Sequence, residues 1–184
     1  MAVMTKEEFV QHVKSDTLPM YRLAYSILQN SADAEDAVSE AIVHAYEKLD
    51  TLKKADSFRN WILQIAANEA KKIYRQNKRT SPVEWEENLS PEFYDEHHEL
   101  WDAVMQLDGG YRDVIVLFYY ERCTIPEISR ILECRQGTVK SRLQVSLSSS
   151  GHTVAAMRAL SYQSRYAFYQ DATLGIEYYQ HITR

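Results

Sequence analysis

Apolar residues recur with a helical period along residues 1–79. Between residues 31 and 49 they keep to one face, and Ser31 or Asp33 is placed to cap the helix. The apolar positions of this segment are Val38, Ala41, Ile42, Ala45, Tyr46 and Leu49. The mostly apolar side of a second segment, 57–75 with Ser57 as its cap, consists of Phe58, Ile62, Ile65, Ala66, Glu69 and Ile73. The pattern predicts a compact helical unit, because no glycine punctuates the chain before Gly109.

An earlier helical pattern runs through Phe9 and Val13 and resumes from Met20 to Leu28. Between the second and third segments, residues 50–56 break the period as a short polar loop. Residues 80–97 contain two prolines, many acids and no helical period, which is typical of a linker.

The chain beyond this linker predicts a second helical unit. Leu100, Trp101, Val104 and Leu107 form a short helix, residues 108–110 form a turn, and another helix covers residues 111–122. Thr124 and Glu127 then form a capping box around Pro126, which is tolerated in the first turn of a helix.

A short break at Glu133 and Cys134 precedes one more helix, which contains Val139 and Leu143. Two helices separated by so short a turn indicate a helix-turn-helix. The predicted fold is therefore all-α, with small helical domains at 1–79 and 98–143 and an acidic linker at 80–97. An atypical, aromatic-rich tail follows at 144–184, in which residues 153–169 can be helical.

The charge of the chain changes this picture only when it is counted by segment. A net charge of −5 over 184 residues argues against a nucleic-acid binder. However, residues 53–79 carry +6 and residues 130–142 carry +3, whereas residues 1–52 carry −5 and residues 80–102 carry −8. Two basic islands separated by acidic stretches indicate local binding surfaces, although solvated helix faces would give the same count.

Cysteine content and hydropathy bear on the compartment. Cys123 and Cys134 are too few for a disulfide framework, so we expect an intracellular, cytoplasmic protein. The chain has no apolar run of 18 residues, and its first residues do not resemble a signal peptide. We therefore expect no membrane insertion.

The last predicted helix has the side chains of a DNA reader on its exposed side: Gln136, Thr138, Lys140, Ser141 and Arg142. A helix fits the major groove, where these residue types contact base edges and phosphates. Gly137 near its start permits close approach of the backbone to a phosphate. Many helical hairpins have basic faces, however, so a purely structural role stays open.

The helix at 57–75 has a polar stripe that ends in positive charge: Asn60, Gln64, Asn68, Lys71, Lys72 and Arg75. Trp61 stands beside this stripe, and Lys53 and Lys54 precede it. Basic side chains beside an aromatic suit a single strand with unstacked bases, because stacking contributes about 1–3 kcal/mol per base. Ordinary core packing is the alternative role for Trp61.

Asp36, Glu40 and Glu47 form an acidic stripe on the helix at 31–49. It is either a solvated face or a surface that docks on a basic partner. Catalysis has little support, because His97, His98, Cys123 and Cys134 lack the paired spacing of a zinc site. Nor does the chain contain a Walker loop, a nucleophile elbow or a zinc-protease motif. We expect no enzymatic activity, no cofactor and no metal.

Three ordered motifs resemble the extracytoplasmic-function sigma factors, small two-domain members of the bacterial sigma-70 family. DAEDAVSEAI at 33–42 is similar to the family's DAEDxxQExF helix, and SFRNWILQIAANEAKKIYR at 57–75 is similar to FRxWLxxIAxNxxxDxxR. LDGGYRDVIVLFYYERCTIPEISRILECRQGTVKSRL at 107–143 is similar to the family's region 4 signature, which ends in GTVKSRL. The resemblance covers about residues 8–79 and 99–143.

The resemblance implies an RNA polymerase sigma factor that directs promoter recognition and transcription initiation. It implies binding to the core polymerase (the beta-prime clamp helices and the beta subunit) through Asp33, Glu35, Asp36, Ser39, Glu40 and Glu47. It implies reading of the melted −10 element through Leu52, Lys53, Lys54, Asn60, Trp61, Gln64, Asn68, Lys71, Lys72 and Arg75. It implies reading of the −35 element through Arg135, Gln136, Gly137, Thr138, Lys140, Ser141 and Arg142. Promoter DNA and an anti-sigma protein are the other implied partners.

The chain departs from the family at several positions. Ala41 stands where the family often has threonine, Ile42 where it usually has an aromatic, and Arg135 where proline is common. Glu133 replaces a turn glycine, which costs on the order of 1 kcal/mol if the residue needs a positive φ. After Leu143 the usual basic helix is missing, because residues 144–157 contain no lysine or arginine.

Other functions stay open at this point. A helix-turn-helix regulator that acts without polymerase explains residues 111–143 but leaves the first two motifs unexplained. A degenerate sigma-like interaction protein is a second alternative. A metal-dependent enzyme using His97, His98 and the cysteines is a distant one.

Overall fold

The computed structural model describes residues 4–80 and 98–148, so the predicted linker after Thr80 and the tail after Ser148 lie outside the described residues. All regular elements of the described parts are helical, which confirms the all-α prediction. The α-helices are α1 Lys6–Leu28, α2 Ser31–Glu47, α3 Phe58–Thr80, α4 His98–Met105, α5 Gly109–Ile115, α6 Ile125–Ile131 and α7 Gln136–Ser148. The shorter segments are η1 Leu49–Thr51, η2 Ala55–Ser57 and the π-helical η4 Val116–Tyr120.

The two stretches of helical pattern before residue 29 form one continuous helix, α1. Its start is fixed by a capping box in which the Thr5 amide donates to Glu8 Oε2 at 2.7 Å and the Glu8 amide donates to Thr5 Oγ at 3.2 Å. The helix continues through Pro19, although proline cannot donate to the carbonyl four residues earlier. It ends at Leu28, and the residue after it, Gln29, caps the helix with a left-handed φ of 50°.

Three predicted features of the helices are corrected by the backbone. Asn30, not Ser31 or Asp33, caps α2, because its Oδ1 accepts from the Asp33 amide at 2.9 Å. Residues 108–110 were expected to form a turn, but α5 already begins at Gly109, because the Asp108 carbonyl accepts from the amides of residues 111 and 112. The helix expected over 111–122 is interrupted by η4, where the Glu121 amide donates to the Val116 carbonyl five residues back.

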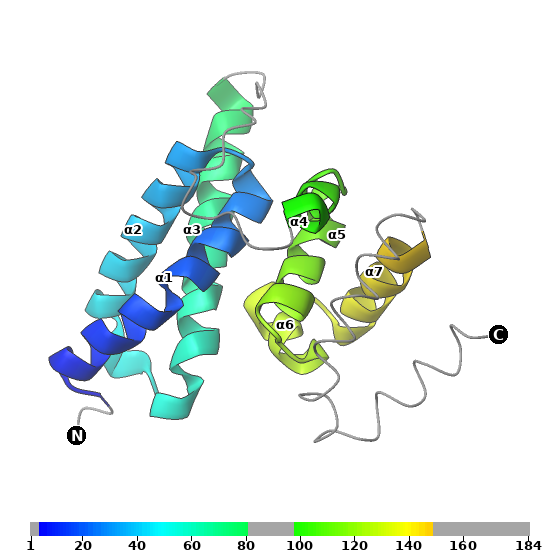
Figure 1. The fold of residues 1–184 in the computed structure, drawn as a ribbon. Helices are drawn as coiled ribbons and strands as arrows, with labels where there is room; N and C mark the ends of the chain where they lie inside the picture. The colour runs from blue at the N-terminus through cyan, green and yellow to red at the C-terminus, as the bar shows by residue number, and fades with distance from the viewer. Residues whose placement is uncertain (1–3, 81–97, 149–184) are drawn as a thin grey trace.

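Helices α1, α2 and α3 pack side by side as an N-terminal bundle (Figure 1). Alanines of α2 and α3 are fully buried where these helices meet, and Phe58, Met20 and Leu23 are the large side chains inside. Tyr46, expected on the apolar face of α2, is instead 47% exposed. Its ring contacts the Phe9 ring edge-on, with the two ring centroids 5.6 Å apart.

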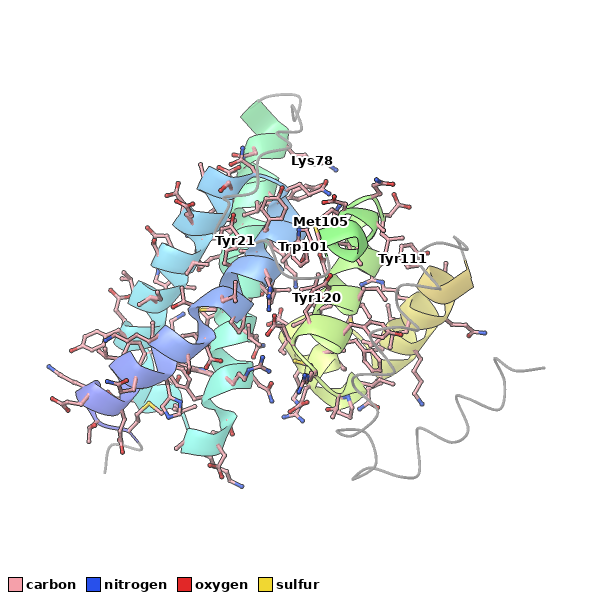
Figure 2. All side chains as sticks on the ribbon, viewed as in Figure 1. Tyr21, Lys78, Trp101, Met105, Tyr111 and Tyr120 are labelled. Carbon is pink, nitrogen blue, oxygen red and sulfur yellow. The ribbon has the colours of Figure 1, made fainter. Side chains whose placement is uncertain are left out.

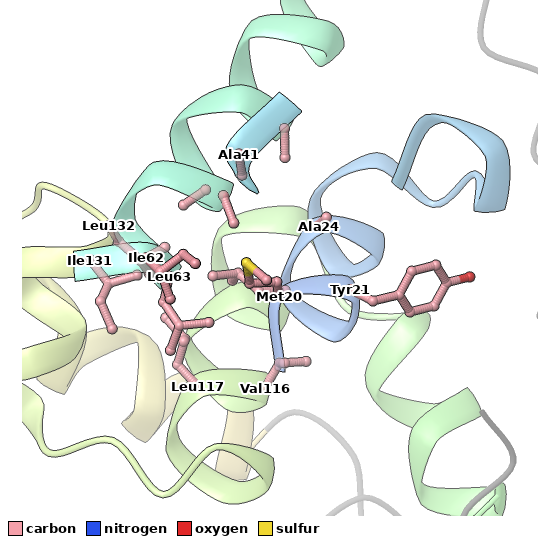
Figure 3. Close-up of a cluster of buried hydrophobic side chains, with 14 of the residues drawn as sticks. Met20, Tyr21, Ala24, Ala41, Ile62, Leu63, Val116, Leu117, Ile131 and Leu132 are labelled. Carbon is pink, nitrogen blue, oxygen red and sulfur yellow. The ribbon is translucent and has the colours of Figure 1, made fainter. Parts of the chain in front are cut away.

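The C-terminal unit, α4 to α7, lies against α1 and α3 of the bundle (Figure 1). Apolar side chains of both parts form one continuous core. Figure 3 shows Met20 of α1, Ile62 and Leu63 of α3 and Leu117 of η4 gathered in this cluster. The contact between the two parts is called the junction below.

Aromatic rings and backbone hydrogen bonds line one end of the junction. The ring of Trp101 in α4 contacts that of Tyr25 in α1, with centroids 6.3 Å apart. It also contacts the ring of Tyr120 in η4, with centroids 5.1 Å apart (Figure 2). Gln29 Nε2 donates to the Met105 carbonyl at 2.6 Å, and this fixes the end of α1 against α4. Two carbonyls accept from Arg112, those of Ser26 and Met105.

Charged side chains cross the middle of the junction. Arg59 of α3 donates to Glu121 Oε2 at 2.7 Å and also contacts Asp16 of α1 at 3.3 Å. Arg22 lies 3.6 Å from the other oxygen of Glu121, whose side chain is only 2% exposed. Burial raises the pKa of both Glu121 and Asp16; Arg59 opposes this effect at both carboxyls, and Arg22 opposes it at Glu121.

The carboxyl of Asp113 in α5 makes folding depend on pH. Burial raises its pKa to about 6, despite its hydrogen bond from Ser26 Oγ and the cations of Arg112, Lys71 and Arg142. Between the ordinary aspartate pKa and about 6, the folded protein binds more protons at this site than the unfolded chain does. The free energy of unfolding therefore decreases as pH rises through this window.

We predict that Asp113→Asn removes this contribution. At pH 7.5 the variant should be more stable than the parent by about 1–2 kcal/mol, and the gain should shrink toward pH 4. Urea denaturation of both proteins at several pH values measures the difference, in which the titrations of Glu121 and Asp16 cancel. A variant less stable than the parent at pH 7.5 would contradict the prediction.

Candidate functional site

The outer face of α2 presents the predicted acidic stripe to solvent. Glu35, Asp36, Glu40 and Glu47 are all exposed, and so is Ser39, whose hydroxyl donates to the Glu35 carbonyl at 2.9 Å. The opposite side of α2 is buried through its alanines. These exposed residues form what we call the α2 acidic face, and the structure brings them together as predicted.

Asp33 was also predicted to bind core polymerase, but it already makes a contact within the protein. It is half-buried, and its Oδ2 accepts from Asn77 Nδ2 of α3 at 2.8 Å. Beside the acidic face lies an open groove of about 660 Å³ between the start of α1 and the second half of α2. Its lining is mostly apolar, with Lys6 and Glu47 at its edge: Lys6, Phe9, Val10, Ile42, Val43, Tyr46 and Glu47.

The predicted polar stripe forms along α3, and we call it the α3 stripe: Asn60, Gln64, Asn68, Lys71, Lys72 and Arg75. Lys72 and Arg75 are exposed, and the other four are half-buried. Trp61 is half-buried as well, with its ring 5.9 Å from that of Phe58, so part of the indole packs on the bundle core. This position is consistent with core packing and also with an indole edge that remains exposed to solvent.

The loop before α3 differs from the prediction at one residue. Lys53 and Lys54 are exposed, as a DNA contact requires, but Leu52 is only 3% exposed. Leu52 belongs to the core cluster. It lies between the two 3₁₀ turns η1 and η2, and its apolar side chain is the one that this loop buries. Leu52 is therefore covered by the bundle in this arrangement, whereas the two lysines after it reach solvent.

The helix-turn-helix forms from α6 and α7. The predicted capping box is present at the start of α6, where the Thr124 amide and hydroxyl each lie 2.7 Å from Glu127 Oε2. Val139 and Leu143 anchor α7 to the core. The other side of this helix and the turn before it are exposed at Arg135, Gln136, Gly137, Lys140 and Ser141.

Two of the residues predicted to read DNA on α7 are less exposed than the others. Thr138 is half-buried, and its carbonyl accepts from Ser141 Oγ at 3.0 Å. The Arg142 guanidinium lies against α5, 3.1 Å from where a Cβ on Gly110 would stand. Gly110 therefore leaves the space that Arg142 occupies, whereas a Cβ on Gly137 would meet open space.

The α3 stripe is not open to solvent along its whole length, because α6 and the turn after it lie against it. Asn60 Nδ2 donates to Glu127 Oε1 at 2.8 Å, and Lys71 Nζ donates to the Leu132 carbonyl at 3.0 Å. Between them, Gln64 and Asn68 donate to one oxygen of Glu133, at 3.0 and 3.4 Å. Four of the six stripe residues are thus bonded to the helix-turn-helix.

Sequence reasoning missed these partners. Arg59 counted only as part of a basic island, and nothing in the local pattern pointed to Glu121 or Glu133 as acceptors across the junction. One signal was available at Glu133, which stands where the related motif has glycine. The structure gives Glu133 a φ of 55°, so the position does require the left-handed conformation.

The residues considered for catalysis carry no such arrangement. His97 lies outside the described residues, and the described parts of the chain contain no cluster of three or more metal-ligating side chains. Burial raises the pKa of the Cys123 thiol to about 12, which leaves it unreactive. Among the helices at 4–80 and 98–148, none is long and apolar enough to cross a bilayer.

Family models match both parts of the molecule. The model described as sigma-70 region 2 matches residues 15–80, and the model described as sigma-70, region 4 matches residues 97–147. A third model, which describes a peptidase-associated region, matches residues 130–184; it overlaps region 4 at its start and otherwise covers the tail.

Known proteins agree with the first two models. The chain is 29% identical to RNA polymerase sigma factor SigV of Bacillus subtilis over 78% of its length and 89% of SigV. It is 30% identical to the ECF RNA polymerase sigma factor SigW of the same organism over 67% of its length and 76% of SigW.

Two solved structures share its fold. The sigma factor RpoE of Bartonella quintana, in complex with the anti-sigma factor NepR, has a TM-score of 0.67 at 20% identity, over 85% of this chain and 98% of that one. CnrH, in complex with the cytosolic domain of CnrY, has a TM-score of 0.58 at 23% identity, over 88% and 92%. The chain belongs to the extracytoplasmic-function sigma factors of the sigma-70 family, which direct RNA polymerase to initiate transcription.

Proposed function

We propose that three surfaces of this sigma factor divide its work among α2, α3 and α7. The α2 acidic face binds the clamp helices of the beta-prime subunit of core polymerase. The α3 stripe, with Lys53, Lys54 and Trp61, holds the melted −10 strand. The exposed side of α7 reads the −35 duplex.

The α2 acidic face carries this proposal. Its acidic side chains are exposed to solvent, while the buried side of the same helix holds the bundle together. A row of like charges on a well-packed helix favours a basic partner through electrostatic complementarity. A helix-turn-helix regulator that works alone would have no use for such a face.

The remaining assignments rest on the chemistry of the exposed side chains. Lys140, Ser141 and Gln136 on α7 can contact base edges and phosphates in a major groove. The lysines before α3, together with Lys72 and Arg75, supply cations along a single strand. We propose further that the protein acts in the cytoplasm and catalyses no reaction itself.

The −10 and −35 elements cannot be read at the same time while α6 and the turn after it lie against the α3 stripe. We call this the closed arrangement. Elements at −10 and −35 are about 25 base pairs apart, which is about 85 Å of duplex at about 3.4 Å per base pair. Side chains of α3 and α6 are hydrogen-bonded directly to each other. We propose that the junction opens when the protein binds polymerase and promoter.

Solved relatives suggest one more partner. RpoE of Bartonella quintana and CnrH were each captured with a second protein, NepR or the cytosolic domain of CnrY. We propose that an anti-sigma protein likewise binds this chain. The closed arrangement leaves the α2 acidic face and the neighbouring groove accessible to it.

Run-off transcription with purified core polymerase tests the proposed function. Full-length protein should enable core polymerase to produce discrete transcripts from genomic promoter fragments. Binding to core polymerase without any transcript would favour the degenerate, sigma-like alternative. Binding to duplex DNA without binding to core polymerase would favour the polymerase-independent regulator.

We predict that Asp36→Lys combined with Glu40→Lys weakens binding to core polymerase by about 100-fold, because each substitution replaces attraction by repulsion. Circular dichroism should remain unchanged, since both residues are exposed on α2. Glu7→Lys, at an exposed position of α1, is the charge-reversal control and should bind core polymerase normally. Pull-down and fluorescence titration measure the affinity; unchanged binding by the double variant would contradict the assignment.

We predict that Lys140→Ala weakens binding of the holoenzyme to a promoter fragment by about 5-fold and lowers the dependence of binding on salt by one phosphate contact. Binding to core polymerase should be unaffected. Lys14→Ala, at an exposed lysine of α1, is the matched control. If Lys140→Ala also abolishes core binding, it acts through folding and not through DNA contact.

A further inference from the structure

Glu133 occupies a backbone position that a glutamate does not favour. It lies in the turn between α6 and α7 with a φ of 55°, where glycine, asparagine or aspartate is the usual residue. Its side chain is exposed, so it is not there to fill the core. A strained residue of this kind persists where it has another use, which makes its contacts informative.

The carboxylate of Glu133 lies on the α3 stripe. Its Oε1 accepts hydrogen bonds from Gln64 Nε2 at 3.0 Å and Asn68 Nδ2 at 3.4 Å. These bonds, and the nearby charge of Lys71, hold the pKa of Glu133 below its usual range, so the group is an anion at neutral pH. An anion therefore sits among donors that would otherwise face the phosphates and bases of a single strand.

We infer that Glu133 substitutes for DNA on the α3 stripe and holds the −10 surface closed in the free protein. The inference rests on the proposed role of the α3 stripe in DNA binding. A carboxylate is suited to this because it presents the same acceptor chemistry as a phosphate to amide and ammonium donors. The flanking bonds of Asn60 to Glu127 and of Lys71 to the Leu132 carbonyl align the turn with the stripe.

Competition between Glu133 and DNA has a measurable consequence. A strand can bind only the fraction of molecules in which the stripe is free, so the apparent affinity is reduced by that fraction. Removing the carboxylate should increase this fraction without adding any contact to DNA. Glycine is the sharpest replacement, because it also accepts the left-handed backbone at no cost.

The experiment compares the full-length parent with Glu133→Gly in binding a fluorescein-labelled, 12-nucleotide single-stranded DNA of randomised sequence at low salt. Fluorescence anisotropy should show that the variant binds about 5-fold more tightly. Its melting temperature should equal or exceed that of the parent, which excludes unfolding as the cause. Equal affinity of the two proteins would overturn the inference.

Two further variants separate the possible causes. Glu133→Gln keeps an acceptor but removes the charge, so its affinity should lie between those of the parent and Glu133→Gly. Glu7→Gln removes one exposed charge from α1 and should leave the affinity unchanged. A gain with Glu7→Gln as large as that with Glu133→Gly would mean a general effect of net charge and would overturn the inference.

A final pair of variants distinguishes this inference from the proposed function. Lys72→Ala with Arg75→Ala, placed in the Glu133→Gly background, should reduce binding to the labelled strand at least 5-fold. If this reduction occurs but Glu133→Gly alone changes nothing, only the role of Glu133 is wrong. If Glu133→Gly binds more tightly but the double substitution has no effect, DNA binds elsewhere, and both the α3 assignment and the inference fail.

Discussion

The buried carboxylate of Glu121 is the constraint on which the arrangement of the molecule depends. It belongs to the C-terminal unit, but the guanidinium groups that compensate it, those of Arg22 and Arg59, belong to the N-terminal bundle. A buried charge without its partner is strongly destabilising, so the carboxylate must be either paired across the junction or returned to water. Because water can replace both arginines, this charged part of the junction opposes opening less than the apolar cluster around Leu117 does.

Helix α3 serves both parts of this arrangement. Its inner side, with Phe58, Ile62 and Ala66, is fixed in the bundle, so the stripe on its outer side is held on a rigid support. The same stripe meets α6 and the turn after it in the closed molecule. The hydrogen bonds between them join polar side chains that are partly exposed to solvent. Such bonds exchange readily for bonds to another polar ligand, because their net contribution is modest, about 1 kcal/mol each. The stripe is thus preformed, and in the closed molecule α6 and the turn after it cover part of it.

Much of the fold could be predicted from the sequence because its signals are local. The helical periods, the capping box at Thr124 and the short turn before α7 depend on residues a few positions apart. Errors arose where tertiary packing decides: Leu52 is buried although its loop is polar, and Tyr46 is exposed although it shares the apolar period of α2. The junction could not be predicted at all, since Arg59 and Glu121 are 62 residues apart and only the folded chain brings them together.

Pro19 divides α1 into two parts that contact different elements of the protein. Phe9, before it, packs on Tyr46 and Phe58 near the groove, whereas Ser26 and Gln29, after it, contact the C-terminal unit. Because the proline withholds one amide from the helix, bending is easiest at this point. A displacement of the second part would therefore bend the helix at Pro19 before it moved the first part. The aromatic contacts of Phe9 and the contacts of Ser26 and Gln29 with the C-terminal unit are thus joined through the most easily bent point of α1.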